Sequence, residues 1–192
     1  MTSLTFEWPG RGLAVDLAGT VVVLSPGREI DLLTSPNDLA HWLRVEEPWL
    51  GPAAEEAALR LPDFRGLRGA IRDLFGAVVA GEPIPDGPVD DLNAASAAVP
   101  TYPVLDVRDP SRPSVATVAG ATKGRTAALL AAIARSAVEI VGGPDRDRLR
   151  VCPAPRCGRF FVSSRPGRRW CTDACGNRAR VARHLQRRRA TG

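Results

Sequence analysis

Four cysteines gather in the last 41 residues of the chain, with the spacing Cys152-x4-Cys157-x13-Cys171-x3-Cys175. Two close pairs joined by a spacer suit a tetrahedral Zn²⁺ site, because each pair holds one side of the ion and the spacer returns the chain to it. We therefore predict one structural zinc ion per chain. Four thiolates complete the coordination shell, which disfavours a catalytic zinc that needs an open position for water. Structural disulfides are disfavoured by the cytoplasmic location argued below.

The residues between the cysteines predict the shape of this unit. Residues 153–158 form a tight turn, residues 159–162 read as a strand, and residues 168–171 return as its partner in a hairpin. Thr172 can cap a helix that begins at Asp173 and runs to about Arg189, which places the last cysteine in its first turn. A knuckle, a hairpin and a helix in this order indicate a finger of the treble-clef or zinc-ribbon type.

The aromatic content of the finger sets its dependence on metal. Phe160, Phe161 and Trp170 are too few to build a self-sufficient core for a unit of this size. Structural zinc contributes roughly 10–16 kcal/mol of apparent folding free energy in small finger peptides. We therefore expect the finger to be disordered without its metal.

The formal net charge of +5 is distributed unevenly along the chain. Residues 152–192 carry eleven Arg against one Asp, whereas residues 1–151 carry 15 Lys and Arg against 20 Asp and Glu. Such clustering indicates an anionic partner for the finger, and arginine can neutralise phosphates or read guanine edges in the major groove. We predict nucleic acid as the partner, DNA before RNA; a solvated basic face that only keeps the protein soluble is the alternative. The predicted contact residues are Arg165, Arg168, Arg169, Arg180, Arg183, Arg187 and Arg188.

Side chains that follow the last cysteine have three further predicted roles. Val181 and Leu185 lie four residues apart and should pack against the finger's aromatic residues. Asn177 is expected to hydrogen-bond backbone near the knuckle. Arg178 is expected to donate to the cysteine sulfurs and offset the net −2 charge of a Zn(Cys)4 centre. Direct contact of Asn177 and Arg178 with bases is the alternative.

The first 143 residues predict a mainly helical domain with small β-hairpins. Gly142-Gly143-Pro144 interrupts the chain, so the domains are residues 1–143 and residues 144–192. Residues 13–19 suit either a helix or a strand. The predicted elements are a turn at 25–28, a helix capped by Ser35 with Pro36 at its first position, two helices over 52–80 separated at Pro62, a loop at 81–88, a helix over 89–99, a hairpin of 102–107 with 114–118, and a central helix over 126–141.

Several function classes find little support. The N-terminus MTSLTFEWPG lacks the pattern of a signal peptide and no stretch is apolar enough to span a membrane, which predicts a cytoplasmic protein. No catalytic arrangement is visible among the two His and the four committed Cys, and AGATKGRT (119–126) lacks the order of a phosphate loop, so no enzyme is predicted. His41 and Trp42 fit packing or a helix surface, with a ligand pocket as the alternative.

Three segments carry a resemblance to a known family. The run Cys175-Gly176-Asn177-Arg178, the segment DRDRLRVCPAPRCGRFF (145–161) and the segment DLLTSPNDLAHWL (31–43) together resemble the CGNR zinc-finger family. In that family an N-terminal ABATE domain precedes a C-terminal finger, and members are described as stress-induced transcription regulators. The chain departs from the family at Leu17-Ala18-Gly19-Thr20, where members tend to carry an asparagine-threonine pair. If that asparagine orders the segment or lines a pocket, the role is weakened here.

The residues and the resemblance together predict a zinc-dependent, nucleic-acid-binding transcription regulator. The finger would contact DNA, and the helical domain would sense a small-molecule ligand or mediate assembly, with a homodimer left open. Two alternatives remain at this stage: an RNA-binding zinc ribbon whose aromatic side chains stack on bases, and a protein-interaction module with a structural zinc.

Overall fold

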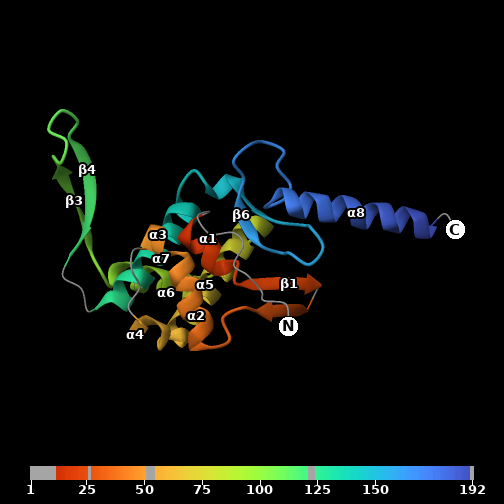
Figure 1. Ribbon diagram of the computed structural model, residues 1–192, viewed down its shortest axis with the longest axis horizontal. Coiled ribbons are helices and arrows are strands. Elements are labelled where there is room, and N and C mark those ends of the chain that lie inside the picture. Colours follow the sequence, from red (N-terminus) through yellow and green to blue (C-terminus); the bar gives the residue numbers. More distant parts are fainter. Residues whose placement is uncertain (1–11, 26, 51–54, 121–123, 191–192) are drawn as a thin grey trace.

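The computed structural model describes residues 12–25, 27–50, 55–120 and 124–190. Helices form the body of the molecule, and the described strands pair as three separate two-stranded antiparallel sheets (Figure 1). No helix in these ranges is long and apolar enough to cross a membrane. The elements in chain order are α1 Leu13–Ala18, β1 Val21–Ser25, β2 Arg28–Asp31, α2 Pro36–Val45, α3 Glu47–Leu50, α4 Glu55–Ala58, α5 Leu61–Ala80, α6 Asp86–Ala97, β3 Thr101–Asp106, β4 Ser114–Ala119, α7 Arg125–Gly142, a 3-10 turn Arg146–Arg148, β5 Leu149–Val151, β6 Phe160–Val162 and α8 Asp173–Ala190.

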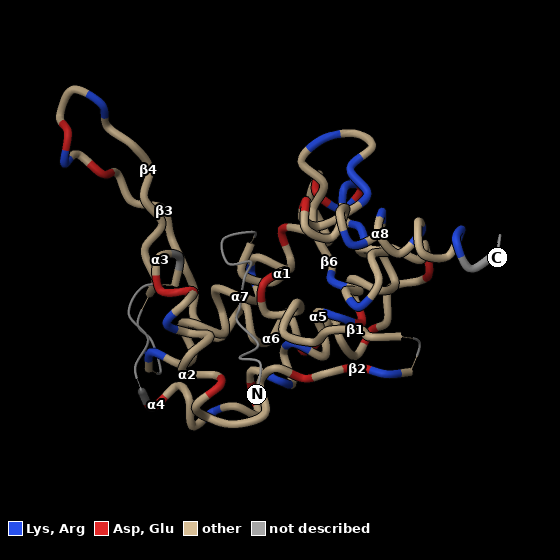
Figure 2. Tube along the Cα trace, turned by 45° about the vertical axis from the view of Figure 1, so that its right-hand side comes forward, with Lys and Arg blue, Asp and Glu red and all other residues tan. Residues whose placement is uncertain are grey.

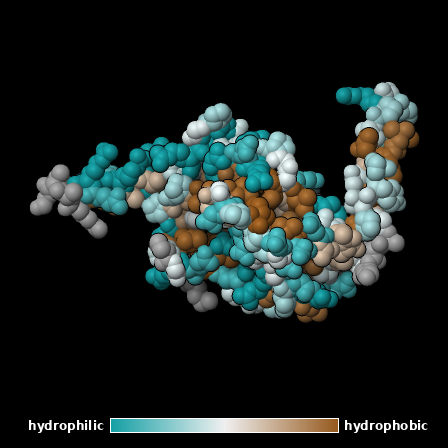
Figure 3. Space-filling view, turned by 180° about the vertical axis from the view of Figure 1, so that it is seen from behind, coloured by the Kyte–Doolittle hydropathy of each residue, from teal (hydrophilic) through white to brown (hydrophobic). Residues whose placement is uncertain are grey.

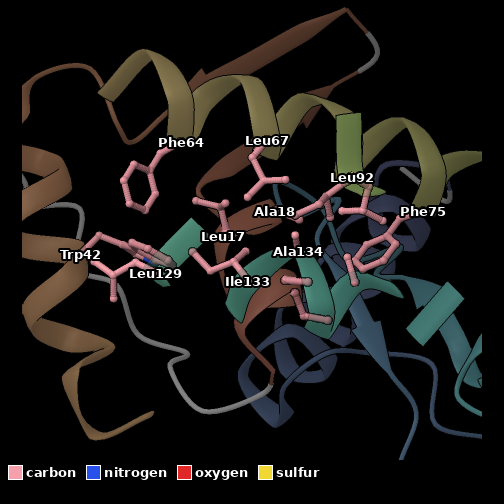
Figure 4. Close-up of a cluster of buried hydrophobic side chains, with 14 of the residues drawn as sticks. Leu17, Ala18, Trp42, Phe64, Leu67, Phe75, Leu92, Leu129, Ile133 and Ala134 are labelled. Carbon is pink, nitrogen blue, oxygen red and sulfur yellow. The ribbon is translucent and has the colours of Figure 1, made fainter. Parts of the chain in front are cut away.

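The core of the body lies between α1, α5 and α7. Leu17 of α1, Phe64 of α5 and Ile133 of α7 are fully buried and point toward one another (Figure 4). Trp42 of α2 closes one end of the core with its ring edge-on to Phe64, at 6.4 Å between ring centroids. The prediction that the apolar helix over 126–141 is central is confirmed, and Trp42 is a packing residue. The neighbouring His41 is exposed.

Local signals placed most helix starts correctly. Ser35 caps α2 in a capping box, in which its hydroxyl accepts from the Asp38 N–H at 3.2 Å and the Asp38 carboxylate accepts from the Ser35 N–H at 2.8 Å. Residues 13–18 adopt the helical alternative. The predicted loop at 81–88 is wrong at its end, because α6 already begins at Asp86 and accommodates Pro88 in its first turn, where a missing N–H costs no helical bond.

A row of arginines on α5 ties the β1–β2 hairpin to the helical body. Arg68 is buried and donates to both carboxylate oxygens of Asp31 at 2.6 and 2.7 Å, and to the Thr20 hydroxyl at 2.9 Å. One turn further along, Arg72 donates to Glu29 at 2.9 Å. Burial alone would raise the pKa of the Asp31 carboxyl, but its hydrogen bonds and the nearby guanidinium charges hold that pKa below its usual value.

The predicted hairpin of 102–107 with 114–118 is confirmed as β3 and β4. The two strands pair in an unbroken register from Thr101↔Ala119 to Asp106↔Ser114. They form an arm that projects away from the helical body, at the opposite end of the molecule from α8 (Figure 1).

The start of the finger is packed into the helical body. Leu149 of β5 and Phe160 of β6 belong to the same buried cluster as α1, α5 and α7. The Phe160 ring lies edge-on to Phe75 of α5 at 5.5 Å between centroids, and the Val23 N–H of β1 donates to the Cys157 carbonyl at 3.1 Å. Residues 144–192 therefore share a core with the preceding residues, and a boundary at residue 143 stays a prediction from the sequence.

The hairpin of the finger differs from the predicted one. The strand Phe160–Val162 pairs with Leu149–Val151, which precedes the first cysteine, and residues 168–171 form no strand. The physical reason is that Leu149 can be buried against α5 and the returning segment cannot, because three of its four residues are Arg168, Arg169 and a cysteine at the metal centre.

Candidate metal centre and basic surface

The four cysteine sulfurs converge on one buried point. Their Sγ atoms all lie within 4.8 Å of one another, and three of the separations are 3.5, 3.6 and 3.7 Å. A tetrahedral zinc with Zn–S bonds of about 2.3 Å places its sulfurs roughly 3.8 Å apart, whereas a disulfide requires about 2.05 Å. All four residues, Cys152, Cys157, Cys171 and Cys175, are buried. The cluster thus fits one structural zinc ion, as predicted, and leaves no ligand position open.

Tight backbone turns bring the sulfurs together. Arg156 and Gly158 both adopt positive φ, at 59° and 61°, which reverses the chain beside the second cysteine. The Cys152 N–H donates to the Arg159 carbonyl at 2.8 Å and closes this knuckle. Across the spacer, Thr172 caps α8 as predicted: its hydroxyl accepts from the Cys175 N–H at 3.0 Å, which fixes the last cysteine in the first turn.

Four sulfur atoms this close together favour a bound cation, because neighbouring thiolates repel one another. Hydrogen bonding to Cys157 lowers the pKa of the Cys152 thiol, whereas the same contact raises the pKa of Cys157. The pKa of Cys171 is also raised, by its contacts with the same two sulfurs. Without a positive ion, therefore, the sulfurs cannot all be thiolates at neutral pH, and a bound zinc resolves this conflict.

Two arginines lie against the metal centre. Arg178 donates from Nη2 to the Cys175 sulfur at 3.0 Å, so the predicted contact of this residue with a cysteine sulfur is present. Arg159 was not singled out from the sequence; burial lowers the pKa of its guanidinium, and the charges of the nearby cysteines partly offset this. Asn177 differs from expectation: it is exposed, and its side-chain oxygen accepts from Arg180 instead of from knuckle backbone.

Arg168 braces the loop that joins β6 to the metal centre. Its guanidinium donates to the Trp170 carbonyl at 3.0 Å, to the Ser164 hydroxyl at 3.0 Å and to the Cys171 carbonyl at 2.6 Å. It also lies over the Phe161 ring, 5.8 Å from the centroid. With its donors engaged in this way, Arg168 holds the loop in one shape, whereas the sequence had placed it among the phosphate contacts.

The braced loop presents arginines on its surface. Arg165 and Arg169 are exposed on it. One side forms a groove of about 750 Å³, which is lined by these two side chains and by Arg148 and Arg150, and none of the described residues that line it is acidic. A second hollow of about 610 Å³ is also lined by this loop and reaches Asp173 and Arg180 on α8. Basic segments gather around this loop and along α8 (Figure 2). Sequence reasoning missed Arg148 and Arg150 because they precede the cysteines.

Helix α8 extends from the metal centre as a free arm (Figure 1). Its predicted contact residues Arg180, Arg183, Arg187 and Arg188 are all exposed. The expectation that Val181 and Leu185 pack against the finger is wrong, because these side chains are 59% and 50% exposed. Only the first turns of the helix lie against the finger, and the later turns run past it.

Two known protein families match the sequence. Residues 11–144 match the ABATE family, whose description is "Putative stress-induced transcription regulator", and residues 148–188 match the CGNR zinc finger. Neither description is that of an enzyme. Among curated proteins, none matches the sequence. The resemblance drawn from the three sequence segments is thus confirmed, and the four convergent sulfurs lie within the matched finger. The chain belongs to the ABATE family and carries a CGNR zinc finger with the cysteines of one structural zinc site.

Proposed function

We propose that the protein is a cytoplasmic transcription regulator whose zinc-braced finger binds DNA. The observation that carries this proposal is the pairing of a rigid metal centre with two exposed arginine surfaces, the loop that bears Arg165 and Arg169 and the projecting helix α8. The finger is of the treble-clef type in this proposal, since a knuckle between two paired strands is followed by a helix that supplies the last ligand from its first turn.

The geometry of the basic surface favours duplex DNA. Helix α8 spans 18 residues, about 27 Å at 1.5 Å per residue, and stands clear of the body so that it can enter a major groove. Arg180 and Arg183 are exposed on the helix, while Arg165 lies on the loop beside its start. In this arrangement the helix reads the groove and the loop contacts backbone phosphates, which fix the orientation.

The test is a fluorescence-anisotropy titration of the zinc-loaded, full-length protein with labelled duplex DNA and with single-stranded RNA, at several salt concentrations. For duplex DNA, log K should fall with log salt by about 0.9 for each phosphate contacted. The double variant Arg183→Gln, Arg187→Gln should bind more weakly and show a shallower slope. The matched control Arg44→Gln, Arg112→Gln removes the same charge from exposed positions outside the finger and should bind as the wild type does.

Three outcomes would contradict the proposal. Equal losses in the two double variants would mean that net charge alone drives binding. Tighter binding to single-stranded RNA than to duplex would support the RNA-binding alternative. If neither nucleic acid binds at low salt, the exposed Val181 and Leu185 on α8 favour the second candidate function, a protein-interaction module whose basic helix docks on an acidic partner.

A further inference from the structure

Among the described residues, none covers either face of the β3–β4 arm. Residues of one face include Tyr102 and Val118, which are 52% and 39% exposed, and residues of the other include Leu105 and Val115, which are 70% and 74% exposed. Figure 3 shows hydrophobic side chains along the projecting arm, in contrast with the hydrophilic surface of α8 at the other end. An isolated two-stranded hairpin is at best marginally stable in water, and exposed apolar patches of this kind mark interaction surfaces.

The register of the arm shows which backbone groups are available for pairing. Pro103 lies opposite Thr117 and has no N–H, so this pair must be one of the non-hydrogen-bonded pairs of the antiparallel ladder. In such a pair the N–H and C=O groups point away from the partner strand. Thr117 therefore directs both groups toward the open edge of β4, and so do Val115 and Ala119 at the same phase of the strand.

The open edge of β4 lacks the devices by which proteins protect a sheet edge. Residues 114–119, SVATVA, contain no charge and no proline, and the pairing with β3 runs over six residue pairs without a bulge. The outer edge of β3 is protected, because Pro103 removes a donor from its centre. An unprotected, regular edge beside exposed apolar side chains is a template for adding another strand.

The charge of the arm indicates which molecule can supply this additional strand. Residues 101–119 carry Asp106 and Asp109 against Arg108 and Arg112, so the arm is neutral, and both signs lie toward its tip (Figure 2). A strongly acidic or basic partner gains nothing here, whereas a second arm meets no repulsion. The arm also lies at the opposite end of the molecule from the basic finger, so two copies can join without bringing their fingers together.

We propose that two copies of the chain pair through β4, related by a twofold axis, so that their arms form one four-stranded antiparallel sheet. The interface is isologous, because Thr117 of each copy faces the same edge of the other. The proposal holds whether or not the finger binds DNA.

The surface available sets the expected affinity. Pairing along the β4 edge leaves both faces of the arm open to water, so it covers only parts of Val115 and Val118 in each copy, on the order of 100 Å² for one arm. Two arms supply about twice this, which falls below the roughly 1,200–2,000 Å² of a stable interface even with the added main-chain pairing. We therefore expect a reversible dimer with a dissociation constant in the micromolar range.

The test compares two substitutions at one position by sedimentation velocity, on zinc-loaded protein from about 1 μM to about 200 μM. Thr117→Pro removes the outward N–H and leaves the bonds between β3 and β4 in place; Thr117→Ala keeps that N–H. We expect the wild type and Thr117→Ala to dimerise alike, and Thr117→Pro to raise the dissociation constant about tenfold or more, because twofold symmetry removes each lost bond twice. Circular dichroism and zinc content check that both variants fold.

Residue-resolved hydrogen exchange locates the interface independently. The amides of Val115, Thr117 and Ala119 should become protected as the protein concentration rises, while the outward amides of Thr101 and Leu105 on β3 exchange as fast as before. A monomer throughout the concentration range, a dimer that Thr117→Pro leaves intact, or a dimer in which the β4 amides still exchange freely would each overturn the proposal. Protection of β4 only on addition of an extended peptide would assign the edge to another protein.

Discussion

Replacement of Gly158 by alanine tests whether the zinc knuckle is seated on the N-terminal hairpin. Gly158 has φ +61°, and a Cβ built on it would lie 2.4 Å from the Cβ of Val23 in β1. Non-bonded carbon atoms essentially never approach within about 3 Å of each other, so either the knuckle or β1 must move. The two segments are joined at this point by the hydrogen bond from the Val23 N–H to the Cys157 carbonyl, at 3.1 Å.

Gly167→Ala is a matched control within the same finger. Gly167 also has a left-handed φ, +78°, but nothing lies within 4 Å of the position of its Cβ. An alanine in this conformation costs about 1 kcal/mol at either position. Overpacking against Val23 adds roughly 1–3 kcal/mol at Gly158 only. We therefore expect Gly158→Ala to lower the free energy of unfolding by about 2–4 kcal/mol and Gly167→Ala by about 1 kcal/mol.

Urea unfolding of the zinc-loaded protein measures this difference, and each kcal/mol also lowers the melting temperature by roughly 2–4 °C in a chain of this size. Hydrogen exchange at the Val23 amide reports on the contact itself and should accelerate in Gly158→Ala but not in Gly167→Ala. Equal destabilisation by the two substitutions, with an unchanged Val23 amide, would refute the reasoning that the knuckle rests on β1.

Three further predictions concern the core, a buried acid and the metal. Phe160→Ala should destabilise the whole protein by about 3–5 kcal/mol in urea unfolding, because its ring is buried in the main core; loss of finger structure alone would contradict this. Burial and then the charge of Asp16 raise the pKa of Glu46 from about 4.5 to about 8, so between these values the folded state holds a proton that the unfolded state has lost. Wild-type stability should therefore fall as pH rises from about 4.5 to about 8, whereas Glu46→Gln should flatten this dependence in thermal melts. Arg178→Gln should weaken zinc retention roughly 10–100-fold in a chelator competition, since it removes the donor to the Cys175 sulfur.

The features that the sequence predicted well are those set by a few neighbouring residues. The cysteine spacing gave the metal cluster, Ser35 and Thr172 gave two helix caps, and the alternation of apolar residues gave the β3–β4 hairpin. In each case the interaction lies within one loop, one helical turn or one hairpin, so the pattern of residue types specifies it directly.

The features that the sequence missed depend on contacts between distant segments. The pairing of Arg68 with Asp31 joins residues 37 positions apart, and no periodicity marks either one as buried. Phe160 looked like part of an isolated finger, yet its ring lies against α5. Conversely, Val181 and Leu185 have helical spacing typical of a buried face but lie exposed, because the spacing of a helix does not say where the helix points.

Phe160 and Cys157 connect the metal centre directly to the helical body, whereas the sequence suggested an independent finger. Cys157 is the second cysteine of the metal centre, and its carbonyl accepts a hydrogen bond from Val23 of β1. Phe160 follows it before the third cysteine and packs against Phe75 of α5. Arg72 reinforces this link, since it donates to Glu29 of β2 and lies 5.9 Å from the centroid of the Phe160 ring. Zinc binding to the cysteines therefore stabilises the packing of the finger against β1 and α5 as well as the finger itself. By linkage, whatever free energy zinc binding contributes to holding the β1–β2 hairpin in place, the docked hairpin contributes to zinc binding.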